Sequence, residues 1–157
     1  METIQNQHME VKRDPFTIST DPKLLNVDFV HKFLREESYW AKNIPREVVQ
    51  KSIEHALCYG VYEEGKQVGF ARVITDYSTV AYLSDIFIIE GYRGKGLSKW
   101  LVEVIMAHPE LQHLRRWLLL TVDAHDLYRK FGFEHPKNPE WYMEKVTPNV
   151  YQSNSSH

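Results

Sequence analysis

The chain has one cysteine and no long apolar segment, and these two absences limit what it can be. Of its 157 residues only Cys58 is a cysteine, so no internal disulfide can form and a reducing, cytoplasmic location is favoured. No stretch approaches the roughly 20 consecutive apolar residues of a transmembrane helix, and residues 1–14 lack the apolar centre of a signal peptide. We therefore expect a cytoplasmic protein without a membrane partner, in which Cys58 is a buried small hydrophobic residue and no nucleophile.

The chain also lacks a large excess of charge of either sign. The 19 Lys and Arg residues nearly balance the 21 Asp and Glu residues, for a formal net charge of −2. Dedicated nucleic-acid binders are normally strongly basic, so we expect no nucleic-acid partner. The eight histidines include no His-Glu-x-x-His pattern, and one cysteine cannot give zinc-finger spacing, so we expect no metal site.

What is present is enough apolar sequence for one core. Hydrophobic residues make up 43% of the chain, and the length suits a single domain over 1–157, with flexible ends at 1–14 and 152–157. The predicted strands, in chain order, cover residues 16–19, 59–63, 67–75, 80–89, 117–120 and 141–146. Helices are predicted from residue 26, from Pro45 and from Leu97, the last stopped by Pro109.

The most informative stretch runs from residue 85 to residue 133. It reads as a strand, a glycine-interrupted turn at 91–96, a helix, the uninterrupted apolar run 117–120 and a short closing helix. An apolar run of this kind is typical of a parallel strand buried on both faces, so the stretch predicts a βαβ unit. The free N–H groups at the turn and the positive end of the helix dipole suit an anion, above all phosphate.

Several phosphate and hydrolase motifs fail at this turn. A Walker A loop requires Lys and then Ser or Thr directly after its second glycine, but Leu97 and Ser98 follow Gly96. The dinucleotide pattern also fails, because Lys99 stands where its third glycine would be. No Gly-x-Ser-x-Gly elbow of a serine hydrolase occurs. A purely structural turn remains as the plain alternative.

Two motifs match instead. The first is the pattern Arg-x-x-Gly-x-Gly/Ala, present as Arg93-Gly94-Lys95-Gly96-Leu97-Ser98. The second follows one helix and one strand later, as Ala124-x-x-Leu127-Tyr128-x-Lys130-Phe131-Gly132-Phe133. Together they resemble the GCN5-related N-acetyltransferase (GNAT) family, clearly over residues 67–133. Within that family the chain looks most like small bacterial acetyltransferases with a Ser-Tyr-Trp-Ala linker after the first helix.

The resemblance implies an α/β (α+β) fold with a mixed central sheet of about six to seven strands, an antiparallel meander followed by the βαβ unit, and helices on both faces. It implies acetyl-CoA as co-substrate, with the pyrophosphate on the N–H groups of residues 93–98. The strands ending near Ile88 and Leu120 would part beyond Ile88, and the pantetheine arm would bond to the backbone of Ile86 and Ile88. The N–H of Ile88 would then polarise the thioester carbonyl.

The expected cofactor-binding residues are therefore Ile86, Ile88, Arg93, Gly94, Lys95, Gly96, Leu97, Ser98, Thr121 and Lys130. Two of them depart from the family pattern, since Ser98 replaces the preferred Gly or Ala and Thr121 stands where an asparagine often lies. Serine is still small enough for close backbone approach, and the Thr121 hydroxyl can still form a hydrogen bond. Arg93, Lys95 and Lys130 either add charge beside the phosphates or form a solvated face.

For catalysis the resemblance implies that Tyr128 is the general acid that protonates the leaving thiolate, or else an anchor for the thioester sulfur. We predict Asp85 as the general base, with a buried structural role as the equal alternative. The aromatic side chains of Tyr39 and Trp40 either dock on the core or line a site. The acceptor side is expected to use residues 36–40 and the loop near His135, with aromatics and carboxylates receiving a cationic amine.

The sequence thus predicts an N-acetyltransferase that transfers acetyl from acetyl-CoA to a small-molecule or peptide amine without a covalent enzyme intermediate. A homodimer would be common for such a family. Two alternatives stay open: a non-catalytic acyl-CoA-binding or regulatory module on the same fold, and a nucleotide-binding protein that uses the glycine turn alone.

Overall fold

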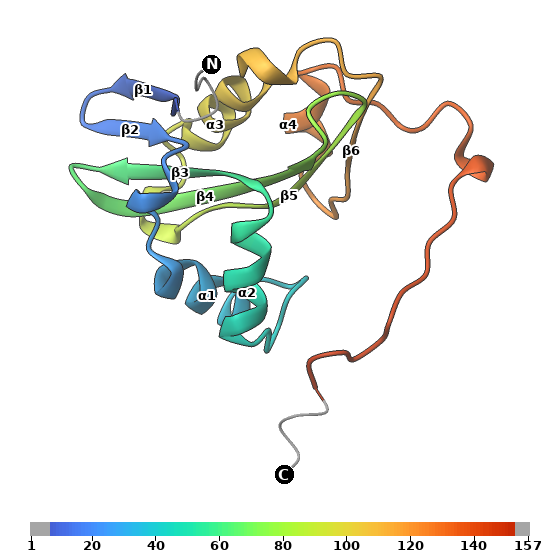
Figure 1. Ribbon diagram of the computed structural model, residues 1–157, viewed down its shortest axis with the longest axis horizontal. Helices are drawn as coiled ribbons and strands as arrows, with labels where there is room; N and C mark the ends of the chain where they lie inside the picture. Colours follow the sequence, from blue (N-terminus) through green and yellow to red (C-terminus); the bar gives the residue numbers. More distant parts are fainter. Residues whose placement is uncertain (1–6, 153–157) are drawn as a thin grey trace.

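A computed structural model describes residues 7–152, which form one mixed sheet covered by helices (Figure 1). The six strands lie in the order in which they occur in the sequence, and their bounds are β1 Glu10–Arg13, β2 Phe16–Ser19, β3 Leu57–Glu63, β4 Lys66–Thr75, β5 Val80–Ile88 and β6 Arg116–Leu119. Strands β1 to β5 pair antiparallel, whereas β6 pairs parallel to β5. The meander and the parallel βαβ unit were both predicted, and both are confirmed.

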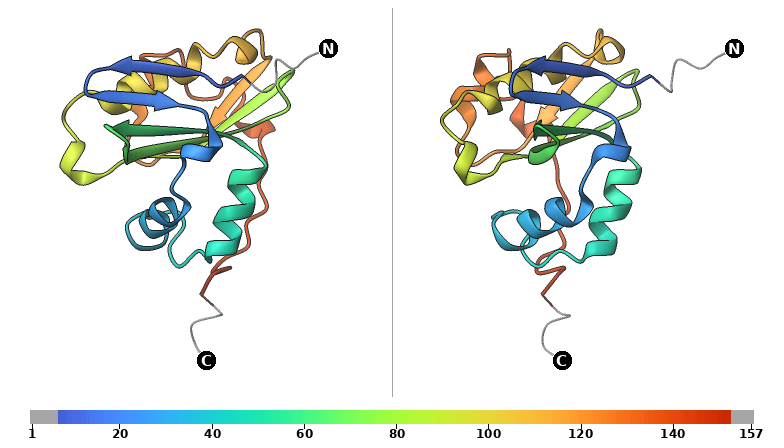
Figure 2. Two further views of the ribbon diagram at one scale, coloured as in Figure 1. Left: turned by 60° about the vertical axis from the view of Figure 1, so that its left-hand side comes forward. Right: turned by 90° about the vertical axis from the view of Figure 1, so that its left-hand side faces the viewer.

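Two layers of helices cover the sheet. Helices α1 (Val27–Glu36) and α2 (Arg46–Glu54) lie on one face, while α3 (Leu97–Met106) and α4 (His125–Arg129) lie on the other (Figures 1 and 2). The side chain of Asn26 caps α1 by accepting a hydrogen bond from the N–H of Phe29. The predicted α/β fold with helices on both faces is therefore confirmed. Within residues 7–152, no helix has the length and apolar character to cross a bilayer.

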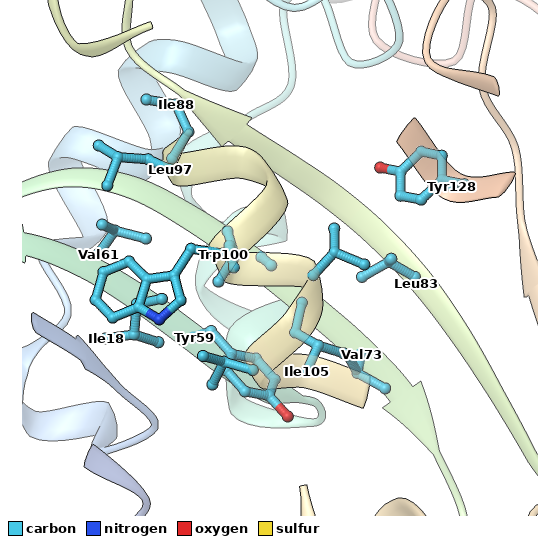
Figure 3. Close-up of a cluster of buried hydrophobic side chains, with 14 of the residues drawn as sticks. Ile18, Tyr59, Val61, Val73, Leu83, Ile88, Leu97, Trp100, Ile105 and Tyr128 are labelled. Atoms are coloured by element: carbon cyan, nitrogen blue, oxygen red, sulfur yellow. The ribbon is translucent and has the colours of Figure 1, made fainter. Parts of the chain in front are cut away.

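Each helical layer has its own core. Under α3 the largest buried side chains include Trp100 and Leu101 of the helix and Tyr59 of β3 (Figure 3). Under α1 and α2 the buried set includes Phe33, Phe70 and Phe87, and the rings of Phe33 and Phe87 stack at 3.8 Å between centroids. Cys58 belongs to this second core, and burial raises the pKa of its thiol to about 12. The prediction of a buried Cys58 is confirmed.

Strands β5 and β6 pair over only four residues and then part. Their register runs from Val80 opposite Arg116 to Leu83 opposite Leu119, and β5 continues to Ile88 without β6. A β-bulge coincides with the parting, because the β4–β5 register shifts between Phe70 and Arg72 and Asp85 has φ +53°. The strands were expected to part beyond Ile88. That position was wrong by five residues, since the bulge turns β5 away sooner.

Two further sequence predictions differ from the structure. Strand β1 lies within residues 1–14, which were predicted to be flexible. Its charged sequence has no apolar alternation, and its pairing with β2 defines it. The predicted strand over 141–146 was wrong: a 3-10 turn, Pro139–Trp141, leads into chain without ladder partners among the described residues. The predicted flexible tail at 152–157 lies outside the described residues except for Gln152.

Candidate active site

The turn between β5 and α3 forms a shallow cradle of backbone. Gly94 and Gly96 both have φ +81°, in the left-handed region that favours glycine, and Gly96 caps the ten-residue helix α3. A Cβ atom placed on Gly94 or Gly96 would meet nothing within 4 Å, so the backbone faces open space. The turn lines a cavity of about 230 Å³. Exposed N–H groups at a helix N-terminus beside such a space form an anion site.

Five of the six residues predicted to bind the pyrophosphate line this cavity: Arg93, Gly94, Gly96, Leu97 and Ser98. Ile88, which was predicted to bind the pantetheine arm, lines it as well. The Nε of Arg93 donates to the carbonyl oxygen of Ile88 at 2.8 Å, which holds the turn against the end of β5. The two other predicted cations, Lys95 and Lys130, are exposed and do not line the cavity. Among the residues that the structure describes, no cluster of His, Cys, Asp or Glu could hold a metal ion.

Beyond the bulge, β5 has no strand partner within residues 7–152 on the side that faced β6, although the carbonyl of Ile88 accepts the hydrogen bond from Arg93. The N–H of Ile89 donates to the carbonyl of Val68, on the β4 side, at 3.0 Å. Because successive N–H groups along a strand point to opposite edges, the N–H of Ile88 points away from β4 and into the gap left by β6. The gap therefore offers an unpaired strand edge to an extended ligand. This is the arrangement expected from the sequence, in which the two strands part and a pantetheine arm binds between them.

A larger cleft, of about 390 Å³, lies in this gap. Three segments that are far apart in the sequence line it: Tyr39 and Trp40 of the α1–α2 linker, residues 82–86 of β5, and residues 119–124 with Tyr128. The predicted residues Asp85, Ile86, Thr121 and Tyr128 are thereby brought together. The Thr121 hydroxyl accepts a hydrogen bond from the N–H of Ala124 at 3.0 Å, which shapes the turn into α4.

Tyr128 is the buried phenol of this cleft. It is 5% exposed, and its hydroxyl points from α4 toward β5 (Figure 3). Burial is the largest cause that raises the pKa of Tyr128 to about 12, with the nearby Tyr39 and Asp123 adding to it. The phenol is thus held in its protonated form over the whole neutral range, which is the form that can give up a proton.

Asp85 is held by two partners at the bulge. Its two carboxylate oxygens accept hydrogen bonds from the Nε1 of Trp40 at 2.7 Å and the Nε of Arg72 at 2.8 Å. The Asp85 side chain is 8% exposed and that of Arg72 15%, so the ion pair is largely buried. These contacts favour the structural alternative for Asp85. The Asp85 carboxylate can still accept further hydrogen bonds, since a carboxylate can accept about four.

The aromatic linker both docks and lines the cleft. Tyr39 accepts a hydrogen bond through its hydroxyl from the N–H of Val122 at 3.2 Å, and its ring meets that of Trp40 edge-on at 5.0 Å. Residues 36–40 were expected on the acceptor side, and of these only Tyr39 and Trp40 line the cleft. Glu36 forms an ion pair with Arg35. His135 lies in a neighbouring groove beside β6. Tyr39 and Trp40 therefore bridge β5 and the β6–α4 turn across the cleft.

With this geometry described, the chain can be compared with known proteins. Residues 27–133, more than half of the chain, match the sequence model of the Acetyltransferase (GNAT) family. The chain belongs to the GNAT acetyltransferase family. It is an acetyl-CoA-dependent acetyltransferase, and the resemblance seen in the two sequence motifs is confirmed.

Relatives agree with this assignment. A protein named as an acetyltransferase from Gibberella zeae is 32% identical over 140 residues, covering 75% of this chain and 78% of its own. The spermine/spermidine N(1)-acetyltransferase of Bacillus subtilis is 33% identical over 99 residues, covering 55% of this chain and 65% of its own. A crystal structure described as a GNAT-family acetyltransferase from Xanthomonas campestris is 47% identical, with a TM-score of 0.85, covering 87% of this chain and 96% of that one.

Sequence reasoning overlooked part of this acetyltransferase's cleft. Tyr82, Ser84 and Asp123 also line it. Asp123 is exposed and has no ion pair among the described residues. It lies in the turn between the parallel strand β6, which ends at Leu119, and α4, and ligand sites of α/β sheets gather at the carboxyl ends of parallel strands. That position was the signal that could have identified Asp123 from the sequence.

Proposed function

We propose that this acetyltransferase transfers acetyl from acetyl-CoA to a primary amine of a small molecule or peptide, by direct attack in a ternary complex. The observation that carries the proposal is the parting of β5 and β6 after Leu83, which opens an unpaired strand edge between the glycine turn and Tyr128. This edge runs from Ile86, which lines the cleft that contains the protonated phenol, to Ile88, which lines the cavity at the glycine turn. A covalent enzyme intermediate is not part of the proposal, because Cys58 is buried outside this cleft.

The co-substrate would be held mainly by backbone. The N–H groups of residues 93–98 would bind the pyrophosphate at the start of α3, with Lys95 and Lys130 adding positive charge from the surface. The backbone of Ile86 and Ile88 would bind the pantetheine arm as an added strand. The open space above the glycine turn supports this fit, since nothing lies within 4 Å of the Cβ positions of Gly94 and Gly96.

The chemistry requires charge stabilisation and two proton movements. The Ile88 N–H would donate to the thioester oxygen as negative charge develops on it during amine attack. As the C–S bond breaks, the Tyr128 hydroxyl would give its proton to the leaving sulfur. A phenol whose pKa is raised to about 12 is present in the required protonated form.

The amine must lose a proton before or during attack. Asp85 remains the proposed acceptor of this proton, directly or through water, because it lines the same cleft as Tyr128. Asp123 is a second carboxylate on that lining and, unlike Asp85, has no ion pair among the described residues. If Asp85 only orients Trp40, Asp123 is the carboxylate that remains to receive the proton.

A cationic amine is the acceptor that best matches the cleft lining. The rings of Tyr39, Trp40 and Tyr82 present aromatic faces, and Asp123 supplies an exposed negative charge. The spermine/spermidine acetyltransferase among the relatives has a polyamine acceptor, which supports an amine of this chemistry here. We propose a cytoplasmic location, where acetyl-CoA and such amines are available.

The test has two stages. Calorimetry of the purified full chain with acetyl-CoA should give a 1:1 binding isotherm, and a panel of primary amines should then be screened for free-thiol release. We expect thiol release with at least one cationic amine and none without amine. If calorimetry detects no heat of binding at millimolar acetyl-CoA, the proposal that this chain binds acetyl-CoA is overturned.

One observation favours a second candidate, a non-catalytic acyl-CoA-binding module. Both oxygens of Asp85 are already engaged by Trp40 and Arg72. This candidate predicts normal acetyl-CoA binding with no thiol release across the whole amine panel, so the same two-stage experiment separates it from the enzyme.

A further inference from the structure

The cleft proposed for acetyl transfer has an apolar rim. Leu120 and Val122, in the turn between β6 and α4, line the cleft and are 78% and 72% exposed. Tyr39 and Trp40 of the α1–α2 linker line it as well, and both rings are exposed. We call these four residues the rim. Apolar side chains that gather in solvent around one opening are typical of a ligand-binding groove.

Contacts between its members connect the rim to the proposed reaction site. The Tyr39 hydroxyl accepts a hydrogen bond from the N–H of Val122 at 3.2 Å, and the Tyr39 ring meets that of Trp40 edge-on at 5.0 Å. The indole N–H of Trp40 in turn donates to the Asp85 carboxylate at 2.7 Å. The part of an acceptor that adjoins its reacting amine would therefore lie on the rim.

Only one carboxylate on the described lining of the cleft, that of Asp123, has no ion pair. The charged residues of this lining are Asp85 and Asp123, and Asp85 already pairs with Arg72. A neighbouring groove continues from Asp123 to Asp126 and Arg129, but the Asp126 carboxylate pairs with Arg129 at 3.0 Å. One ammonium group therefore finds a partner here, whereas a second would meet the apolar rim or the positive charge of Arg129.

We propose that the acceptor is a small primary amine with a single positive charge and an apolar substituent that covers the rim; this inference rests on the proposed function. A methyl group or a ring gains free energy on Leu120 and Val122, because apolar surface is removed from water. An ammonium group at the same place loses part of its hydration and receives no carboxylate in return. The inference narrows the acceptor away from the polyamines for which the Bacillus subtilis relative is named.

The size of the cleft also limits the acceptor. Its volume of about 390 Å³ is at the small end of ligand sites, which span about 300–1,000 Å³. The acetyl group and the end of the pantetheine arm would fill part of this volume. The remaining space suits an alkyl or aryl group of a few carbon atoms, whereas a peptide would have to extend past the rim.

Two amines of the same length test the charge and the apolar contact together. Pentylamine carries a methyl group where 1,4-diaminobutane carries its second ammonium group. Steady-state thiol release by the purified full chain should give a kcat/KM for pentylamine about tenfold above that for diaminobutane. The kcat/KM should also rise about threefold with each methylene from propylamine to pentylamine.

Substitution of Val122 tests where the substituent binds. In Val122→Asp the new carboxylate replaces apolar surface and can receive a second ammonium group, so the ratio of kcat/KM for pentylamine to that for diaminobutane should fall about tenfold. Leu24→Asp is the matched control, because it adds the same charge at an exposed apolar position outside the cleft; its ratio should stay at that of the unchanged protein. The near-isosteric Val122→Thr should lower the ratio about threefold without adding charge. A ratio does not depend on the fraction of enzyme that is folded, so reduced stability cannot imitate these effects.

Each other outcome overturns a defined part of the inference. If diaminobutane or spermidine is the better substrate, the apolar acceptor is excluded and the proposed function stands. If phenylalaninamide, which imitates a peptide N-terminus, is acetylated faster than phenethylamine, the small-molecule assignment is wrong. An unchanged ratio in both Val122 variants would show that the rim does not bind the substituent.

Calorimetry of amine binding to the complex with CoA separates this inference from the proposed function. If pentylamine binds more tightly than diaminobutane and no amine releases thiol, only the proposed function fails. If no amine binds and none releases thiol, both are overturned.

Discussion

At the glycine-turn end of the site, the cavity is lined by one stretch of the chain, 88–99, together with Leu127. At the Tyr128 end, the cleft is lined by three segments that are far apart in the sequence and that contain Trp40, Asp85 and Tyr128. The first end needs only a local conformation, in which Gly94 and Gly96 adopt positive φ. The second depends on long-range contacts such as that between Trp40 and Asp85. This difference predicts that function at the glycine-turn end is lost when the backbone is strained. Function at the Tyr128 end is lost when a single side-chain group is removed.

The largest effect is expected at Gly96. Gly96→Val forces a β-branched residue to φ +81° and fills the space above the turn, so acetyl-CoA affinity should fall about 100-fold. Calorimetry measures this loss. Gly65→Val is the matched control, because Gly65 also has positive φ, +90°, with nothing within 4 Å, but does not line the cavity. Equal affinity loss in both variants would show that strain alone, and no cradle, explains the result.

At the other end, Tyr128→Phe should lower kcat about 100-fold and leave acetyl-CoA affinity within about twofold, because only the proton donor is removed. Steady-state thiol release and calorimetry measure the two quantities. Tyr59→Phe is the control: Tyr59 is also buried, lies outside the cleft, and its hydroxyl has no partner among the described residues.

The pH profile sharpens the same prediction. The pKa of Tyr128 is raised to about 12, above its ordinary value of 10.0, so the proton-donating form persists as pH rises through 10. Activity should therefore show no alkaline loss assignable to Tyr128 below about pH 11. A Tyr128-dependent decline centred near pH 10, absent from Tyr128→Phe, would contradict the burial of this phenol.

A smaller effect on catalysis is expected at Asp85. Asp85→Asn leaves the Arg72 charge unpaired in a largely buried site, so the free energy of unfolding should fall by about 3 kcal/mol. Its amide oxygen can still accept from Trp40, so KM for the amine should rise only about threefold if Asp85 positions this ring. Urea unfolding and amine-dependent kinetics measure these effects.

Two controls separate the roles of Asp85. The double variant Arg72→Gln/Asp85→Asn removes both charges and should recover part of the lost stability. If Asp85 is the base, Asp85→Asn would instead lower kcat strongly. Asp123→Asn should produce that result if Asp123 accepts the amine's proton.

The sequence by itself determined the elements whose cause is local. Proline and glycine bound α3, the apolar run 117–119 makes β6 a parallel strand, and the two motifs identified the family. The cofactor end was predictable for the same reason, because Gly94 and Gly96 impose the turn without help from distant residues. The alternation over 141–146 led to a wrong strand prediction, because alternation alone supplies no pairing partner.

Tertiary structure decided what depends on distant contacts. Strand β1 exists through its pairing with β2, and β5 leaves β6 at Leu83 because of the bulge at Asp85. Trp40 and Arg72 reach the same carboxylate from 45 and 13 residues away in the sequence. Such contacts follow from how whole layers pack. For this reason, residue types and spacing could identify Asp85 and Tyr128 as candidates but could not reveal the partners that set their roles.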